Sequence, residues 1–340
     1  MRLENWPKPP KDNGLGIHWA DVTLASLETY LPIAKALHLK WIVLCDGDPV
    51  RIGKVASVLS AEGIMPIARP DSKINGNRDF RAAAQQCNSP YVIVYNEFGD
   101  EREWRGGRRP ANWREIARDK WIGGAHAVRS AGCHPGLQVM SPDELWDMLA
   151  WMKLHGDDVL WPDMFIALHQ YSALGCPPDC TKHEEYDVLG FQGYVDVCLK
   201  WMGYVPPIIV TEGGYTDGQG TPADRARWMV QIFDSFRTGI LPTGQPLPDY
   251  LFAFCPWILF SVPIAMWYGF SWTQNERNIP MLEAVKAMPE FERGNPTPPI
   301  PPEEPENWRV VSPWMVEAEA LKDLARLGML GFNHYEFERR

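Results

Sequence analysis

Two glutamates in this sequence follow short apolar runs of strand length. Glu97 ends the run Tyr91-Val-Ile-Val-Tyr-Asn-Glu97, and Glu212 ends the run Pro207-Ile-Ile-Val-Thr-Glu212. Two carboxylates held together can divide acid–base chemistry, because one attacks or accepts a proton while the other donates one. One glutamate of this kind could simply end a strand at the solvent. Two of them, both set among aromatic residues, favour a catalytic pair.

The runs before these glutamates are rich in Val, Ile and Tyr, which is typical of strands buried on both faces in a parallel sheet. Strand-like segments alternate with helix-like segments along most of the chain. The expected strands span 14–19, 41–46, 65–69, 91–97, 136–140, 165–171, 207–212 and 251–257. Such alternation implies parallel strands with right-handed crossovers, and eight units predict an α/β protein with a (β/α)8 TIM barrel.

An open, doubly wound sheet is the alternative fold. It would normally carry a glycine-rich phosphate loop after the first strand, and the segment that begins at Trp19 is not one. Two helix starts support the alternating pattern. Ser141-Pro142 and Thr221-Pro222 each combine an N-cap residue with a proline at the first helical position.

The barrel is expected to occupy residues 1–293. A proline-rich stretch, 294–311, predicts an extended linker, and 312–340 predicts a short C-terminal helical segment that begins at Ser312-Pro313. This segment either packs back on the barrel or belongs to a connection in a longer protein. Packing back is favoured, because an exposed apolar stripe would be an interaction liability.

Composition excludes several classes of partner. The chain has 33 Lys and Arg against 43 Asp and Glu, a net charge of −10, which argues against a nucleic-acid or anionic-membrane partner. No uncharged apolar run is long enough to predict a membrane span. Sixteen Trp among 340 residues suit the flat faces of sugar rings, although most of them are expected in the core.

The N-terminus lacks the apolar stretch of a signal peptide, so a cytoplasmic location is the default expectation. An extracellular location would require that a leader was removed or that export follows another route. Seven scattered cysteines argue against a disulfide framework. Cys176, Cys180 and His183 have ligand types that suit zinc but lack a fourth ligand, so a loop clip or two free thiols are favoured. No metal and no cofactor is predicted.

In a barrel, the C-terminal ends of all strands meet at one face. The residues expected there are His18, Trp19, Asp46, Arg69, Asn96, Glu97, His169, Tyr171, Glu212 and Trp257. Two carboxylates, an amide, an arginine, a His/Tyr pair and tryptophans are the groups that retaining glycoside hydrolysis needs. A carbohydrate is therefore the expected substrate.

At these positions the sequence resembles the clan A glycoside hydrolases, retaining (β/α)8-barrel enzymes that include cellulases, mannanases and β-glycosidases. The resemblance rests on Asn96-Glu97 at strand four, His169-x-Tyr171 at strand six, Glu212 at strand seven and Trp257 at strand eight. It covers residues 10–290 through the order of strands rather than through long identity.

The resemblance implies a role for each matching residue. Glu97 corresponds to the general acid/base and Glu212 to the nucleophile. Asn96 would bind the 2-hydroxyl of the sugar at the cleavage point. Tyr171 would donate a hydrogen bond to the nucleophile, His169 would contact the substrate or the acid/base, and Trp257 would form a platform beneath the sugar ring. His18 and Trp19 are expected to contact the substrate as well.

The local sequence supports this division. Glu97 is flanked by Tyr95, Phe98 and Trp104, which are expected to desolvate its side chain and keep it protonated. Glu212 precedes two glycines, whose bare backbone lets donors approach and favours the ionised form.

One position departs from the resemblance. Many clan members have an arginine at the end of strand two, whereas here that strand ends in Cys45-Asp46 and an arginine, Arg69, ends strand three. Either Arg69 takes the arginine's role or Asp46 binds a sugar hydroxyl.

Two other classes of function remain open. One is a non-catalytic carbohydrate-binding barrel. The other is a metal-dependent barrel hydrolase that uses His18, His169 and Asp46, or the cluster of Cys176, Cys180 and His183. The sugar, the linkage, endo or exo action and the oligomeric state are not predicted.

Overall fold

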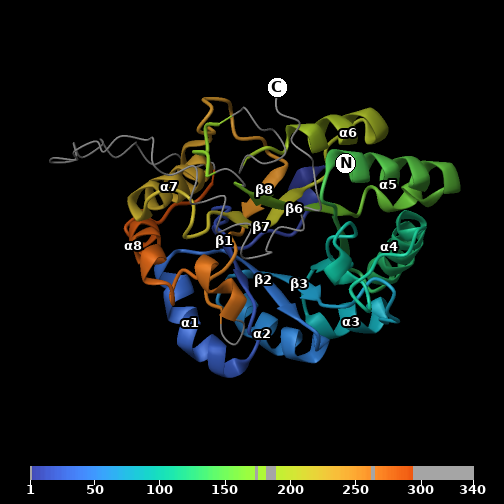
Figure 1. Cartoon of the computed structure of the whole chain (residues 1–340), viewed down its shortest axis with the longest axis horizontal. Helices are drawn as coiled ribbons and strands as arrows, with labels where there is room; N and C mark the ends of the chain where they lie inside the picture. Colours follow the sequence, from blue (N-terminus) through green and yellow to red (C-terminus); the bar gives the residue numbers. More distant parts are fainter. Residues whose placement is uncertain (1, 173–174, 181–188, 262–264, 294–340) are drawn as a thin grey trace. The chain divides into compact units, whose positions relative to one another are not determined.

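The chain forms a (β/α)8 barrel (Figure 1). The structure, a computed structural model, describes residues 2–172, 175–180, 189–261 and 265–293. The strands are β1 (Gly16–Trp19), β2 (Trp41–Asp46), β3 (Met65–Pro70), β4 (Tyr91–Ile93), β5 (His134–Gln138), β6 (Phe165–Tyr171), β7 (Ile208–Gly214) and β8 (Leu251–Phe254). The helices are α1 (Leu24–Ala36), α2 (Pro49–Ala61), α3 (Phe80–Cys87), α4 (Trp113–Ser130), α5 (Pro142–His155), α6 (Gln192–Met202), α7 (Pro222–Thr238) and α8 (Ile279–Lys286).

The expected linker 294–311, the expected helical segment 312–340 and His183 lie outside the described residues. No helix in the described ranges is both long and apolar enough to span a membrane.

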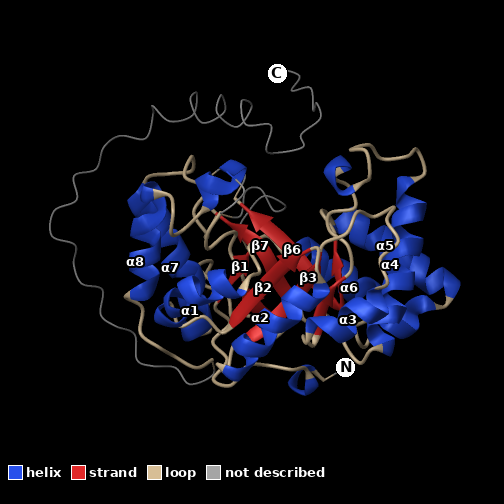
Figure 2. Cartoon of the chain, turned by 90° about the horizontal axis from the view of Figure 1, so that it is seen from below, coloured by secondary structure: helices blue, strands red, loops and turns tan. Residues whose placement is uncertain are grey.

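The sheet closes on itself. All neighbouring strands are parallel and follow the chain order from β1 to β8. β8 then meets β1 through a bridge between Leu15 and Phe254, and the His18 amide donates to the Pro256 carbonyl at 2.9 Å. Figure 2 shows the strands at the centre with the helices around them. This confirms the predicted barrel and contradicts the open-sheet alternative.

The strands bury two separate layers of side chains, because successive residues of a strand point to opposite faces. Most of the inward layer consists of Trp41, Val43, Ile67, Tyr91, Ile93, Phe165, Ala167, Ile209 and Phe252. The N-terminal segment covers the start of the strands. There Trp6 stacks on His134 with ring centroids 4.0 Å apart, and the Tyr91 hydroxyl donates to the Pro7 carbonyl at 2.6 Å. The opposite end of the barrel stays available for polar side chains.

The two predicted helix starts are confirmed. The Ser141 hydroxyl accepts a hydrogen bond from the Glu144 amide at 3.2 Å, and proline follows the cap. Thr221 and Asp224 form a capping box at the start of α7. These caps satisfy amides that have no partner within the helix, and so they fix where α5 and α7 begin.

Three strands end earlier than expected. β4 ends at Ile93 and β8 at Phe254, and β5 ends at Gln138. Tyr95 and Glu97 have φ angles of 60° and 29°, in the left-handed region, so the chain cannot continue the β4 ladder through them. The residues after β4 therefore belong to a turn, which changes where their side chains point.

Gly136 in β5 offers a test of the barrel packing. A Cβ atom at this position would lie 2.5 Å from Cζ of Phe165, whose ring fills the interior against Tyr91. We expect Gly136→Ala to lower the free energy of unfolding by about 1–3 kcal/mol, because the interior has no room for another methyl group. Urea denaturation, monitored by tryptophan fluorescence, measures this change.

Gly123→Ala in α4 is the matched control, because an added Cβ there meets no atom within 4 Å. This substitution should raise the free energy of unfolding by up to about 1 kcal/mol through helix propensity. A Gly136→Ala protein as stable as the control would contradict the packing described above.

Candidate active site

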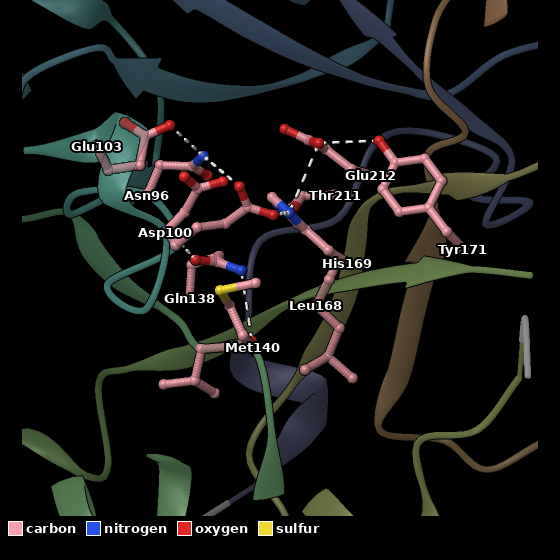
Figure 3. A network of polar contacts seen from close by, with 12 residues as sticks. Asn96, Asp100, Glu103, Gln138, Met140, Leu168, His169, Tyr171, Thr211 and Glu212 are labelled. Atoms are coloured by element: carbon pink, nitrogen blue, oxygen red, sulfur yellow. Dashed lines mark hydrogen bonds and ion pairs between the residues drawn. The ribbon is translucent and has the colours of Figure 1, made fainter. Parts of the chain in front are cut away.

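The predicted pair of glutamates is brought together at the C-terminal end of the barrel. His169, in β6, lies between the two carboxylates. Its Nδ1 is 2.8 Å from Glu97 Oε1 and 3.6 Å from Glu212 Oε2. In Figure 3, His169 lies next to Glu212 and Tyr171 on one side, with Asn96 and Glu103 on the other. One imidazole nitrogen thus reaches both glutamates.

A bulge in β7 turns Glu212 toward the barrel axis. Leu168 pairs with Val210 and His169 with Glu212, so Thr211 is an extra residue on β7. Ile209 belongs to the inward layer, and strict alternation would therefore point Glu212 outward. The extra residue shifts the alternation by one position, as β-bulges do near active sites.

The turn after β4 directs Asn96 and Glu97 to the same side. The left-handed backbone at Tyr95 and Glu97 replaces the alternation of a strand. The Gln138 side chain, at the end of β5, accepts a hydrogen bond from the Glu97 amide. Gln138 is fully buried, and it therefore fixes the backbone of the turn. Sequence reasoning missed this residue, although it lies within the expected strand 136–140.

The aromatic neighbours of Glu97 in sequence do not supply its polar contacts. Tyr95, Phe98 and Trp104 belong to the core cluster between the strands and the helices. The Glu97 carboxylate instead contacts His169 at 2.8 Å and the amide nitrogen of Asn96 at 3.5 Å.

Glu212 is a buried carboxylate with charged and polar neighbours. Arg69 donates a hydrogen bond from Nη1 to Oε1, and the Tyr171 hydroxyl donates to Oε2 at 2.9 Å. Burial raises the pKa of Glu212. The positive charges of His169 and Arg69 oppose burial, and so do the hydrogen bonds from Arg69 and Tyr171. The net effect holds the pKa of Glu212 below its usual value, which keeps the carboxylate ionised.

Arg69, near the end of β3, lies beside Glu212, where the sequence analysis had left open whether an arginine would be present. Besides Glu212, it donates from Nε to the Cys45 thiol at 3.1 Å and from Nη1 to Asn96 Oδ1 at 3.3 Å. Its guanidinium also lies 5.8 Å from the ring centroid of Trp257. Cys45, which sequence reasoning did not single out, is thus the inward residue at the end of β2.

Two predicted site residues lie elsewhere. Asp46 follows Cys45 and so points outward, where it accepts a hydrogen bond from the Asp48 amide at 2.7 Å and pairs with Arg51 at 3.3 Å. Its carboxylate serves the start of α2 rather than a substrate. This prediction is wrong because it ignored the two-residue alternation of β2.

Trp19 is the second correction. It is fully buried, packs edge-on against Phe260 with ring centroids 5.3 Å apart, and donates from its indole nitrogen to the Asp21 carbonyl. The preceding residue, His18, is the one that points inward. A strand places adjacent residues on opposite faces, so both residues could not line the site.

The two histidines have opposite charge preferences. His18 is fully buried against Trp257, with ring centroids 4.2 Å apart. Burial, followed by the charges of Arg69 and His169, holds the pKa of His18 well below its usual value, so it is neutral. For His169, burial lowers the pKa, but the negative charges of Glu212 and Glu97 outweigh it and raise the pKa. His169 therefore favours the cationic form.

His18 also carries unused hydrogen-bonding capacity. Within the described ranges, neither of its ring nitrogens has a hydrogen-bond partner, and Nε2 is 3.9 Å from Glu212 Oε1. Nε2 of His169 is likewise buried and without a partner there. Buried polar atoms normally have partners, so these nitrogens are candidates for contacts with a bound ligand.

An aromatic wall adjoins Trp257. The η4 segment (Ala265–Phe270) brings Trp267 edge-on to Trp257, with centroids 4.7 Å apart, and Phe270 to within 5.8 Å of the Tyr171 ring. Asn275 holds the backbone of this segment by donating to the Tyr268 carbonyl at 3.2 Å. Trp267 and Phe270 therefore add two aromatic rings beside Trp257 and Tyr171, and sequence reasoning had assigned neither of them to the site.

The described residues do not include a group of three His, Cys, Asp or Glu side chains placed to hold a metal ion. His18 and His169 lie at the site, but Asp46 is turned away to the start of α2. The suggested cluster of Cys176, Cys180 and His183 includes one residue outside the described part of the chain.

Comparison with known proteins finds similarity in structure alone. No family model and no curated protein sequence matches the chain. Its structure is similar to a 4-O-α-L-rhamnosyl-β-D-glucuronidase from Fusarium oxysporum 12S, with a TM-score of 0.51, 12% identity, and a match that covers 83% of this chain and 72% of that one. It is also similar to a family 39 glycoside hydrolase from Bacteroides cellulosilyticus WH2, with a TM-score of 0.53, 10% identity and coverage of 82% and 64%. The chain thus spans less than two thirds of the second protein, and at these identities the likeness is one of fold, in agreement with the clan A resemblance.

Proposed function

We propose that this chain is a retaining glycoside hydrolase that cleaves β-glycosidic bonds of an oligo- or polysaccharide by double displacement. Glu97 is the general acid/base and Glu212 is the nucleophile. The proposal agrees with the names of the two similar structures, a glucuronidase and a family 39 glycoside hydrolase. Because the fold hosts many activities, the argument rests on the site itself.

The position of His169 between the two glutamates carries the proposal. Its Nδ1 lies 2.8 Å from an oxygen of Glu97 and 3.6 Å from an oxygen of Glu212, so these two oxygens are no farther apart than the sum of those distances. Inverting enzymes need a separation of about 6.5–9.5 Å to admit a water, whereas retaining enzymes need about 5–5.5 Å. This upper bound lies just below the range for inverting enzymes and is compatible with the shorter separation of a retaining pair.

The environments of the glutamates support the division of roles. Glu212 is the more buried side chain, 10% exposed against 18% for Glu97. Its lowered pKa keeps it ionised, as a nucleophile requires. The more exposed Glu97 is the group that a leaving sugar and an incoming water can both reach.

Each chemical step is balanced by a proton held on Glu97. In the first step, the glycosidic bond breaks, Glu97 gives its proton to the leaving oxygen, and a Glu212 oxygen bonds to the anomeric carbon. In the second step, a water gives a proton to Glu97 and its oxygen displaces Glu212. One negative charge thus moves from Glu212 to Glu97 and back.

His169 suits this exchange of charge. It lies close to both carboxylates, and in its cationic form it would stabilise whichever of the two is ionised. Such a fixed cation is the kind of preorganised electrostatic support that catalysis uses.

The remaining site residues suit the substrate. Asn96 would donate to the hydroxyl next to the anomeric carbon, and Trp257 would offer a flat apolar face to the sugar ring. The unpartnered nitrogens of His18 and His169 are candidates for further hydroxyl groups. These contacts suit a substrate that is rich in hydroxyl groups.

Release of reducing ends from a panel of β-glycans and aryl β-glycosides tests the activity. We expect turnover by the wild type, a fall of about 10²–10⁴-fold in Glu97→Gln, and at least as large a fall in Glu212→Gln. Glu101→Gln, on an exposed residue of the same loop as Glu97, is the control and should retain full activity. Glycan binding without any turnover would favour a carbohydrate-binding barrel, and turnover that survives Glu212→Gln would refute the assigned nucleophile.

The stereochemistry of the product tests the double displacement. Proton NMR of an early reaction mixture should show the β-anomer of the released sugar before mutarotation, because two inversions restore the configuration. The short distances from His169 Nδ1 to both glutamates lead to this expectation. An α-anomer formed first would mean that a water attacks directly and that Glu212 is not a nucleophile.

The pH profile tests the role of Arg69. Arg69→Gln removes a positive charge that, together with that of His169, lowers the pKa of Glu212, so that pKa should rise. Glu212 must be ionised to react, and the acidic limb of kcat/KM should therefore move to higher pH by the same amount. Arg51→Gln is the control, because Arg51 pairs with the outward-facing Asp46. An acidic limb unchanged in Arg69→Gln would contradict this electrostatic role.

A further inference from the structure

A third carboxylate, that of Glu103, lies beside the proposed catalytic pair and has no part in the steps above. Glu103 ends the short η2 helix (Glu101–Glu103) in the loop between β4 and α4. Its side chain is only 15% exposed, and its Oε1 accepts a hydrogen bond from Asn96 Nδ2 at 3.1 Å (Figure 3). Burial raises its pKa, while the hydrogen bond from Asn96 and the positive charges of Lys73, 3.6 Å from Oε2, and Arg69 oppose this rise. Burying a carboxylate destabilises the fold unless hydrogen bonds or an opposite charge compensate for the lost hydration.

The side-chain amide of Asn96 lies between a hydrogen-bond donor, Arg69, and a hydrogen-bond acceptor, Glu103. Arg69, which can only donate, bonds to the amide oxygen of Asn96 at 3.3 Å, while Glu103 accepts through Oε1 from the amide nitrogen at 3.1 Å. If the amide were rotated by 180°, its nitrogen would face the guanidinium and its oxygen would face the carboxylate. The two neighbours therefore permit a single orientation of Asn96.

This orientation leaves one N–H of Asn96 for other contacts. The amide nitrogen carries two hydrogens, and the bond to Glu103 uses one of them. The other has only a long contact, 3.5 Å, to Glu97 Oε2. It is thus available for a substrate hydroxyl close to the acid/base.

We propose that Glu103 is a positioning residue, which acts through Asn96 to aim this N–H at the hydroxyl next to the anomeric carbon. The inference rests on the proposed glycoside hydrolysis. Glu103 touches neither the substrate nor the reacting atoms in this arrangement. Without the Glu103 carboxylate, the amide of Asn96 could adopt more than one orientation. Its hydrogen bond to this hydroxyl would weaken, and the enzyme would discriminate less between a sugar that has the hydroxyl and one that lacks it.

The backbone at Glu103 is held independently of its carboxylate. The Ile74 amide donates to the Glu103 carbonyl at 2.9 Å, and Lys73 Nζ donates to the Arg102 carbonyl at 2.6 Å. The loop is thus tied to the segment after β3 through two of its own main-chain carbonyls. Substitutions of the side chain should therefore leave the loop in place, which makes the inference testable.

The test compares an aryl β-glycoside that the wild type hydrolyses with its 2-deoxy counterpart. The measured quantity is the ratio of the two kcat/KM values in the wild type and in Glu103→Ala, Glu103→Gln and Glu101→Ala. We expect Glu103→Ala to reduce this ratio about tenfold, because one oriented hydrogen bond is lost. Glu103→Gln should keep most of the ratio, because its amide oxygen can still accept from Asn96. Glu101→Ala, on the exposed side of the same turn, should match the wild type.

An unchanged ratio in Glu103→Ala overturns the inference, even if Glu97→Gln and Glu212→Gln still abolish turnover. A ratio in Glu103→Gln as low as in Glu103→Ala overturns it as well. Should Glu103→Ala fail to fold, Glu103→Met, which fills the space without an acceptor, replaces it with the same expectation. If the wild type turns over no glycoside, the proposed function fails, and a crystal structure of the variant decides: a rotated or doubled Asn96 supports the inference, and an unmoved Asn96 overturns it.

Discussion

The ion pair between Arg69 and Glu212 is the interaction on which the rest of the site depends. A buried carboxylate is unfavourable unless a positive charge and hydrogen bonds compensate for the lost water. Arg69 supplies both, and Tyr171 supplies a second hydrogen bond. With Glu212 fixed as an anion, His169 favours the cationic form, and the neighbouring Glu97 meets a cation rather than a bare negative charge. Glu212 is thus held as an anion by two neighbouring positive charges, those of His169 and Arg69.

The geometry of the site comes from places where regular strands are interrupted. An unbroken β7 would turn Glu212 into the outer core, and the extra residue at Thr211 prevents this. An unbroken β4 would place Asn96 and Glu97 on opposite faces, and the left-handed turn at Tyr95 brings both to the barrel mouth. The regular parts of the barrel provide rigidity, and its irregular parts aim the side chains. Both are needed, because a small displacement of a reacting group costs much of its effect.

This division explains what the sequence could and could not predict. The eight strands follow from apolar runs and helix caps, which are local signals, and the pairing of Glu97 with Glu212 follows from the topology. Trp19 and Asp46 were placed wrongly because only every second residue of a strand faces inward, a rule that was available but not applied. Bulges have no comparable local signal. Gln138 and Glu103 escaped notice since their contacts join segments that are distant in sequence or lie within an irregular loop.

The residues that carry the proposed chemistry and the residues that contact the rest of the sugar belong to different parts of the molecule. Glu212 and His169 are strand residues, and their positions depend on the barrel itself. Asn96 depends on Glu103 in a loop, and the aromatic wall beside Trp257 belongs to the η4 segment after β8. Loops tolerate sequence change far better than strands of a closed barrel, because fewer neighbours must adjust. Changes in these two segments can therefore alter which sugar binds while the pair of carboxylates, and the charge that passes between them, stays as it is.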